Sequence, residues 1–205
     1  MNNSHWWQPR RLVLPVTIGM IFILALVPLT DPDLFWHLAN GRLIWSTHNI
    51  PRTDPFSFTM YGKEWVCHEW LTEVIMYGLY KVSPAALIIA TAAVIAATFA
   101  LLAARCRTSP FIAAFCVALA ALTSTPSLGA RPQMLSLFLA SLTFYIVEGG
   151  APLWTLVPLS ALWANLHAGF FTGTVIVGVY LLGKAIETWG AQDRREGSQA
   201  VKQLF

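Results

Sequence analysis

Long apolar segments alternate with short polar connections along most of this chain. The apolar segments fall at residues 12–29, 84–104, 109–125, 133–147, 153–166 and 169–187. A helix needs about 20 mostly apolar residues to cross a bilayer, so we expect six transmembrane helices, of which the fifth is short. The pattern predicts an all-α polytopic membrane protein.

The composition is also that of a membrane protein. Of the 205 residues, 56% are hydrophobic and only 11% are charged, and the mean hydropathy is +0.59. Soluble domains usually carry about 25% charged residues. The net charge of +3 is small and scattered, which excludes a nucleic-acid partner and leaves membrane lipids as the expected surroundings. The 3 cysteines form no CxxC motif, so they indicate neither a disulfide framework nor a cysteine-ligated zinc site.

The distribution of basic residues predicts the orientation. We divide a single membrane domain, 1–205, into an N-terminus (1–11), an external loop (30–83), a transmembrane bundle (84–187) and a tail (188–205). Six spans put both termini on one side, which collects eight of the 13 Lys and Arg residues, whereas five are spread over the much longer opposite loop. The positive-inside rule then places both termini in the cytoplasm. No cleavage pattern follows residues 12–29, so we expect an uncleaved first span.

The external loop, which we call the cap, is expected to have a folded structure of its own. It is too polar to lie in lipid and too aromatic for a solvated linker. Asp31 followed by Pro32 is typical of a helix N-cap with proline in the first turn, which predicts a helix over 32–46. A second helix is expected over 68–82, and both helices are expected to lie along the membrane interface. The aromatic residues of the cap include Trp36, Trp45, Phe56, Phe58, Trp65 and Trp70.

Ionisable and polar residues from three separate segments are predicted to meet at the outer surface. The segments are the cap, the outer end of the span at 133–147, and the junction of the last two spans. Ionisable groups at membrane depth are functional-site candidates by default. The candidates are Asp31, Asp33, His37, Arg42, His68, Glu69, Arg131, Asn165 and His167.

The acids and histidines of the cap suit a divalent metal ion. Asp31 and Asp33 can chelate a cation or divide between metal binding and base catalysis, although helix capping is a purely structural alternative for both. His37 follows Asp33 by one helical turn and faces the same way, and His68 begins the second cap helix. Asp33, His37 and His68 are therefore the predicted ligands of Mg, Mn or Zn. A hydrogen-bonded structural role is the alternative for the histidines.

The remaining candidates suit substrate binding. Arg42 and Arg131 carry planar guanidinium groups that can hold a phosphate, although Arg42 can equally reach the lipid headgroups. Glu69, Asn165 and His167 are further candidates for binding a substrate. Glu69 can instead complement the start of its helix, and His167 can instead satisfy a neighbouring polar group where the helix breaks.

The order of these motifs resembles the first external loop of GT-C type membrane glycosyltransferases, such as protein O-mannosyltransferases and lipid A aminoarabinose transferases. Asp31-Pro-Asp33 is similar to a DxD form of the acidic motif of that family. His68-Glu-Trp-Leu71 takes the place of its Lys-Pro-Pro-Leu element without matching it. Nearly the whole chain also resembles a group of bacterial polytopic membrane proteins, which implies no particular chemistry. The shared motifs are DxxWHLxxGR, DPFSFT, HEWLxE, ARPQ and WANLHxGF.

The GT-C resemblance implies transfer of a sugar from a polyprenyl-phosphate donor to an acceptor at the outer face of a bacterial inner membrane. Asp33 would be the catalytic carboxylate with Asp31 assisting it, and Arg42 or Arg131 would hold the departing phosphate. Members of that family are longer, so the chain would be an amino-terminal module or a reduced member. Two alternatives stay open. One is a non-catalytic membrane module that binds a lipid-linked glycan or an envelope-assembly partner, and the other is a metal-binding membrane protein.

Overall fold

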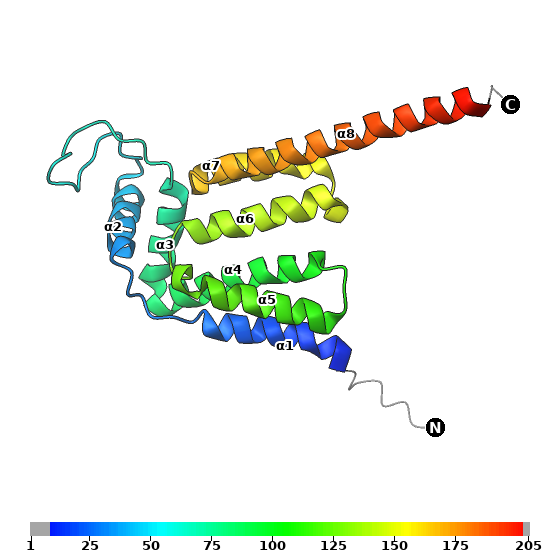
Figure 1. The fold of residues 1–205 in the computed structure, drawn as a ribbon. Helices are drawn as coiled ribbons and strands as arrows, with labels where there is room; N and C mark the ends of the chain where they lie inside the picture. Colours follow the sequence, from blue (N-terminus) through cyan, green and yellow to red (C-terminus); the bar gives the residue numbers. More distant parts are fainter. Residues whose placement is uncertain (1–8, 203–205) are drawn as a thin grey trace.

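Residues 9–202, the part of the chain that the computed structural model describes, form eight α-helices joined by short turns and one long loop. Helices α1 and α4 to α8 lie side by side as a bundle, and α2 and α3 lie across one end of it (Figure 1). The helices are α1 (Pro9–Leu24), α2 (Pro32–Thr47), α3 (Trp70–Val82), α4 (Pro84–Arg105), α5 (Pro110–Ser124), α6 (Gln133–Tyr145), α7 (Leu156–Leu166) and α8 (Phe170–Lys202).

Four helical segments of the described chain are long and apolar enough to cross a membrane. They are Pro84–Arg105, Pro110–Ser127, Gln133–Gly150 and Phe170–Gly190. Each coincides with a predicted span, which confirms a helical membrane protein. Of the remaining two predicted spans, the first is shorter in the structure, since α1 has 16 residues, and the fifth is a short apolar helix, Leu153–Leu166, as predicted.

The first helix ends earlier than its hydropathy predicts. It stops at Leu24 instead of continuing to residue 29. The cause is Pro28, which has no N–H to donate to the carbonyl of Leu24 and whose ring would collide with that carbonyl. The extended segment that follows carries the chain from the bundle to the start of α2.

The two cap helices begin and pack as local sequence dictates. The side chain of Asp31 accepts a hydrogen bond of 3.0 Å from the backbone N–H of Asp33, with Pro32 in the first turn, so the predicted N-cap is confirmed. A Cβ atom at Gly41 would overlap the backbone carbonyl of Glu73. Glycine at this position therefore allows the backbones of α2 and α3 to lie against each other.

Apolar packing and two hydrogen bonds fix the cap to the bundle. Thr72 of α3 donates its hydroxyl to the carbonyl oxygen of Leu166 at 2.6 Å, satisfying one of the free carbonyls at the end of α7. Nε1 of Trp70 donates to Oδ1 of Asn165 at 3.1 Å. Beside these bonds lies a buried cluster that joins α2 and α3 to α4 and to the connection before α6, consisting of Leu34, Leu38, Met76, Leu87 and Ala130.

The loop between α2 and α3 is irregular, as predicted, but it is internally bonded. An isolated antiparallel bridge joins Thr53 to Glu64. The backbone N–H of Asp54 donates to the carbonyl of Lys63 at 2.9 Å, and Gly62 takes a positive φ of 73° at the turn between them. The loop projects away from the helix bundle (Figure 1).

The last helix extends beyond its predicted span. It continues through the polar residues after Glu187 to Lys202, so most of the predicted tail is helical. Helix α1 begins and α8 ends at the bundle end opposite α2 and α3 (Figure 1). Residues 1–8 of the predicted N-terminus and residues 203–205 of the predicted tail lie outside the described part of the chain.

Candidate functional site

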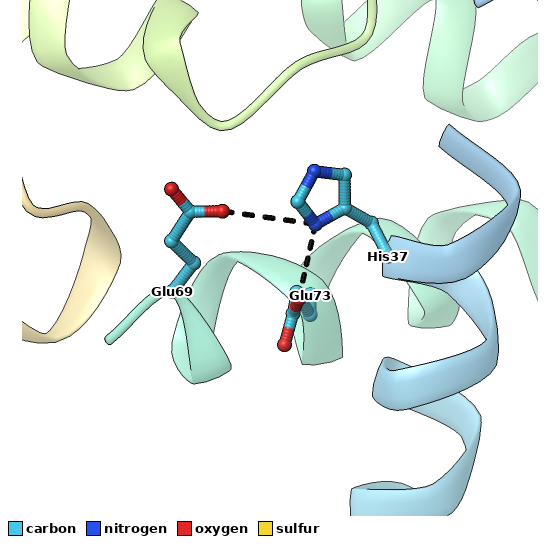
Figure 2. A group of neighbouring side chains, drawn as sticks. All are labelled: His37, Glu69 and Glu73. Atoms are coloured by element: carbon cyan, nitrogen blue, oxygen red, sulfur yellow. Dashed lines mark hydrogen bonds and ion pairs between the residues drawn. The ribbon is translucent and has the colours of Figure 1, made fainter. Parts of the chain in front are cut away.

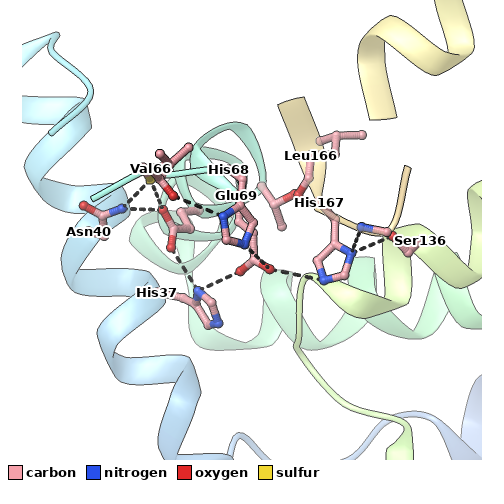
Figure 3. A network of polar contacts seen from close by, with 12 residues as sticks. His37, Asn40, Val66, His68, Glu69, Ser136, Leu166 and His167 are labelled. Atoms are coloured by element: carbon pink, nitrogen blue, oxygen red, sulfur yellow. Dashed lines mark hydrogen bonds and ion pairs between the residues drawn. The ribbon is translucent and has the colours of Figure 1, made fainter. Parts of the chain in front are cut away.

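Polar side chains from several segments meet where α2 and α3 lie against the end of the bundle (Figure 3). They come from α2, from residues 67–69 just before α3, from the first turn of α3, from α6, and from α7 and its junction with α8. Distant parts of the sequence thus supply a single network of hydrogen bonds and ion pairs. Its members are His37, Asn40, Cys67, His68, Glu69, Glu73, Ser136, Trp163 and His167.

Three members of this network have the arrangement of metal ligands. One ligand atom each of His37, Glu69 and Glu73 lies within 4.8 Å of the others. Nδ1 of His37 is 3.0 Å from Oε1 of Glu73 and 3.7 Å from Oε2 of Glu69, so both carboxylates face the same ring nitrogen (Figure 2). Two ligands of a tetrahedral zinc ion, each about 2.0–2.1 Å from it, lie roughly 3.3 Å apart. The three side chains are therefore close enough to hold one metal ion.

The carboxylate of Glu73 is oriented by donors behind it. This side chain is fully buried. Its Oε2 accepts hydrogen bonds from Nδ2 of Asn40 and, at 3.3 Å, from Sγ of Cys67. Burial, with the negative charge of Glu73, raises the pKa of the Cys67 thiol to about 12, so the thiol stays protonated and remains a donor. Because both donors hold Oε2, Oε1 is left facing His37.

The carboxylate of Glu69 is oriented in the same manner from the other side. Its Oε1 lies 3.1 Å from Nε2 of His167. Burial alone would raise the pKa of Glu69, but the hydrogen bond from His167, with smaller electrostatic contributions from the histidines nearby, holds it below its ordinary value. Glu69 is therefore a carboxylate at neutral pH, and its second oxygen faces His37.

The hydrogen bonds around His167 define which ring nitrogen carries the proton. The backbone N–H of Gly169 donates to Nδ1 at 2.9 Å, so Nδ1 is an acceptor and Nε2 carries the hydrogen that bonds to Glu69. The hydroxyl of Ser136 donates to the same Nδ1 at 2.7 Å and accepts from Nε1 of Trp163 at 2.7 Å. Helices α6 and α7 thus hold the ring that orients Glu69.

An ion pair between Asp31 and Arg131 lies beside this network. The Asp31 side chain is 11% exposed and that of Arg131 43% exposed. Burial alone would raise the pKa of Asp31, but hydrogen bonds from Arg131 and the backbone of Asp33, with the charge of Arg131, bring it below its ordinary value. The pair borders a cavity of about 380 Å³ between the α1–α2 and α5–α6 connections.

The structure brings most of the predicted candidates to one end of the bundle, in two neighbouring groups. His37, Glu69 and His167 share the carboxylate–histidine network, Asn165 is bonded to Trp70, and Asp31 is paired with Arg131. The groups adjoin, because α2 carries His37 and has Asp31 as its N-cap. Arg42 is exposed on α2 and makes no ion pair among the described residues.

The metal-ligand set differs from the predicted one. Of the predicted Asp33, His37 and His68, only His37 belongs to the group that the structure assembles. Asp33 is exposed in the first turn of α2 and does not belong to that group. The side chain of His68 is 50% exposed, and its Nδ1 lies 3.1 Å from the carbonyl of Val66.

Several residues of the network were not predicted. They are Asn40, Cys67, Glu73, Ser136 and Trp163. Glu73 carried a sequence signal, since it stands one helical turn after Glu69 at the head of the apolar run Val74–Met76. An acid in an apolar stretch requires a buried partner. The others are ordinary helix or loop residues, and only the packing of α2, α6 and α7 brings them together.

The fold defines the class of the protein, a helical membrane protein with a polar site at one end of its bundle. This chain matches no protein-family model, and no curated protein or solved structure is similar to it. What the site does follows from its geometry and its chemistry.

The ion pair of Asp31 and Arg131 predicts an acid-sensitive contribution to stability. Replacing Arg131 by Gln should lower the melting temperature in detergent at pH 7 by about 2–4 °C, since a half-exposed pair contributes roughly 1 kcal/mol or less. The folded-state pKa of Asp31 lies below its ordinary value of 3.8, so the contribution is complete above that value and is lost as the pH falls through the folded-state pKa.

Thermal unfolding of the wild type and the variant between pH 7 and pH 3 measures this contribution. The difference between them should narrow in acid. Arg42→Gln, which removes an exposed arginine of α2, serves as the matched control and should change the melting temperature little at any pH. A difference between wild type and Arg131→Gln that stays constant into acid would contradict the assignment to Asp31.

Proposed function

We propose that the protein is a membrane glycosyltransferase of GT-C type, or the amino-terminal module of one, that moves a sugar from a polyprenyl-phosphate donor to an acceptor at the outer face of the membrane. This proposal rests on one observation: carboxylates, histidines and an arginine lie close together where the cap adjoins the apolar bundle. The headgroup of a lipid-linked phosphosugar lies at this depth, with its chain in the bilayer.

Arg131 suits the phosphate of such a donor. Its guanidinium is 43% exposed and borders the cavity beside Asp31. It also borders an apolar cavity of about 120 Å³ between α3, α4 and α6, a place for part of a lipid chain. A cation already held by Asp31 needs no reorganisation to stabilise the charge that develops on a departing phosphate. Arg42 and the polar pair Asn165 and His167 are the further proposed substrate contacts.

The two aspartates take different parts in this proposal. Asp31 is engaged by Arg131 and by the backbone of Asp33, so it positions the arginine. Asp33 is exposed and stands in the chain between Pro32 and Leu34, which line that cavity, and it is the carboxylate that would take the proton of the acceptor as general base.

A divalent metal ion fits between His37, Glu69 and Glu73. Two carboxylates face one imidazole in a mostly buried place, and buried charges are costly unless they are balanced. A small cavity of about 20 Å³ reaches Glu69 and Glu73, enough for one ion or water molecule. A set of one nitrogen and two oxygens suits Zn²⁺ or Mn²⁺, whereas Mg²⁺ prefers oxygen ligands alone. Such an ion would polarise a bound oxygen.

The same proposal includes six membrane crossings. Helices α1 and α7 would be the two short ones, since both run alongside the four long helices. With the basic residues near the termini in the cytoplasm of a bacterium, the cap lies outside its inner membrane.

A metal-binding membrane protein without transferase activity is the second candidate. One observation favours it. Neither Asp33 nor Arg131 is among the three proposed metal ligands or among the residues that hydrogen-bond to them. The metal site can therefore be complete without the proposed transferase residues. The two functions differ in whether the lipid-linked sugar is turned over.

The metal site predicts specific cation binding. Titration of the purified chain with Zn²⁺ or Mn²⁺ should show one saturable site, and His37→Gln or Glu69→Gln should weaken it by about 100-fold, because each variant removes one ligand. His68→Gln is the matched control, since this exposed histidine lies outside the group. Unchanged affinity in His37→Gln, or loss of binding in His68→Gln, would show that the ligands are not these three.

The transferase proposal predicts turnover that depends on Asp33. The full chain in nanodiscs, supplied with a polyprenyl-phosphate hexose and outer-leaflet glycan acceptors, should release polyprenyl phosphate, and Asp33→Asn should reduce the rate by about 100-fold or more by removing the base. Glu187→Gln, an exposed acid on α8, is the control and should retain the rate. A chain that binds metal and the lipid-linked sugar yet releases no polyprenyl phosphate would be the non-catalytic protein instead.

A further inference from the structure

A further cavity lies on the cap, next to the small cavity that borders the carboxylate–histidine network. It measures about 390 Å³ and is lined by Trp36 from α2 and by Asp54, Phe56, Ser57 and Trp65 from the loop. The two tryptophan rings stand at 56° with their centroids 6.1 Å apart, so they form a corner rather than a flat platform. With Phe56, aromatic rings make up most of the wall of this outer cavity.

Of the described residues that line the outer cavity, the one with a formal charge is Asp54, a carboxylate. Oδ1 of Asp54 accepts hydrogen bonds from the backbone N–H groups of Phe56 at 2.8 Å and Ser57 at 2.9 Å. A hydrogen bond from the Ser57 hydroxyl, together with these two backbone hydrogen bonds, holds the pKa of Asp54 below its ordinary value. Asp54 is therefore an anion at neutral pH. None of the five described residues that line the cavity is basic.

A corner of aromatic rings with one carboxylate attracts a cation. The face of each ring is negative, and tryptophan is the ring that holds ammonium groups best. We propose that the outer cavity binds a soluble compound with an ammonium group, which lies against Trp36 and Trp65 and pairs with Asp54. The ligand comes from solution because the loop that forms most of the wall projects away from the helix bundle (Figure 1).

The position of the outer cavity connects this ligand with the candidate site. Trp36 and Trp65 also line the small cavity that reaches Glu69 and Glu73. Trp36 stacks against His37 as well, with ring centroids 4.0 Å apart. A bound ammonium compound would therefore lie one aromatic layer from the proposed metal ligands. The binding itself does not depend on the proposed transferase activity or on a metal ion.

Choline and its neutral carbon isostere, 3,3-dimethylbutan-1-ol, test the proposal on the unaltered protein. The full chain is placed in phosphatidylglycerol nanodiscs, which contain no lipid ammonium group, and binding is followed by saturation-transfer NMR of the methyl protons. Choline should bind saturably, and the neutral isostere should bind about tenfold more weakly or not at all, because it lacks the charge that the aromatic corner and Asp54 recognise. Equal binding of the two, or no saturable choline binding, overturns the proposal.

Three variants locate the site. Asp54→Asn removes the charge but keeps the oxygen that the backbone N–H groups of residues 56 and 57 donate to, so the loop should stay folded while choline binds about tenfold more weakly. Phe56→Leu should weaken binding, whereas Phe58→Leu, at a side chain that is 100% exposed and outside the wall, should not. Unchanged affinity in both Asp54→Asn and Phe56→Leu would place the ligand elsewhere and overturn the proposal.

The lipid composition separates a soluble ligand from a headgroup. In phosphatidylcholine nanodiscs, the affinity for free choline should be close to that in phosphatidylglycerol nanodiscs, since the loop that forms most of the cavity wall projects away from the helix bundle (Figure 1). A large loss of choline binding in phosphatidylcholine would mean that the lipid headgroup already occupies the cavity, which would contradict a soluble ligand.

Discussion

Two glutamates one turn apart, the mostly buried Glu69 at the N-cap of α3 and the fully buried Glu73 within it, set the main physical constraint on this structure. A carboxylate that leaves water must be met by donors or cations, or it destabilises the fold by several kcal/mol. Glu73 is met by Asn40 and Cys67, and Glu69 is met by His167. Each carboxylate has one oxygen satisfied in this way, and both second oxygens face the same nitrogen of His37.

The need to satisfy these carboxylates explains much of how the cap sits on the bundle. His167 reaches Glu69 only because α7 ends at Leu166, whose carbonyl accepts the hydroxyl of Thr72. The ring of His167 is then fixed by Ser136 of α6. On the opposite side, Gly41 brings α2 close enough for its polar side chains to reach α3. The site is therefore a junction between the cap and the bundle, and either part alone would leave it incomplete.

The sequence predicted the elements better than it predicted their contacts. Hydropathy located the four long helices, and the pair Asp31 and Pro32 located the start of α2, because these signals are local. Asp33 and His68 were predicted as metal ligands from their spacing along the chain, whereas ligand geometry depends on how α2 crosses α3. Glu73 was missed for the same reason. Its partners, 33 and 36 residues away, are brought to it only by helix packing.

A double-mutant cycle between Glu69 and His167 tests the central claim most directly. Thermal or denaturant unfolding of Glu69→Gln, His167→Gln and the double variant is measured in the presence of a chelator, so that no metal ion contributes. We predict a coupling free energy of about 1–3 kcal/mol, because the two side chains form a mostly buried hydrogen-bonded pair. The corresponding cycle between Glu69 and His68, whose half-exposed ring lies 3.7 Å from that carboxylate, should give a smaller coupling of about 0.5 kcal/mol. Additive effects of Glu69 and His167 would mean that the cap and the bundle do not meet at this carboxylate, and would contradict the account.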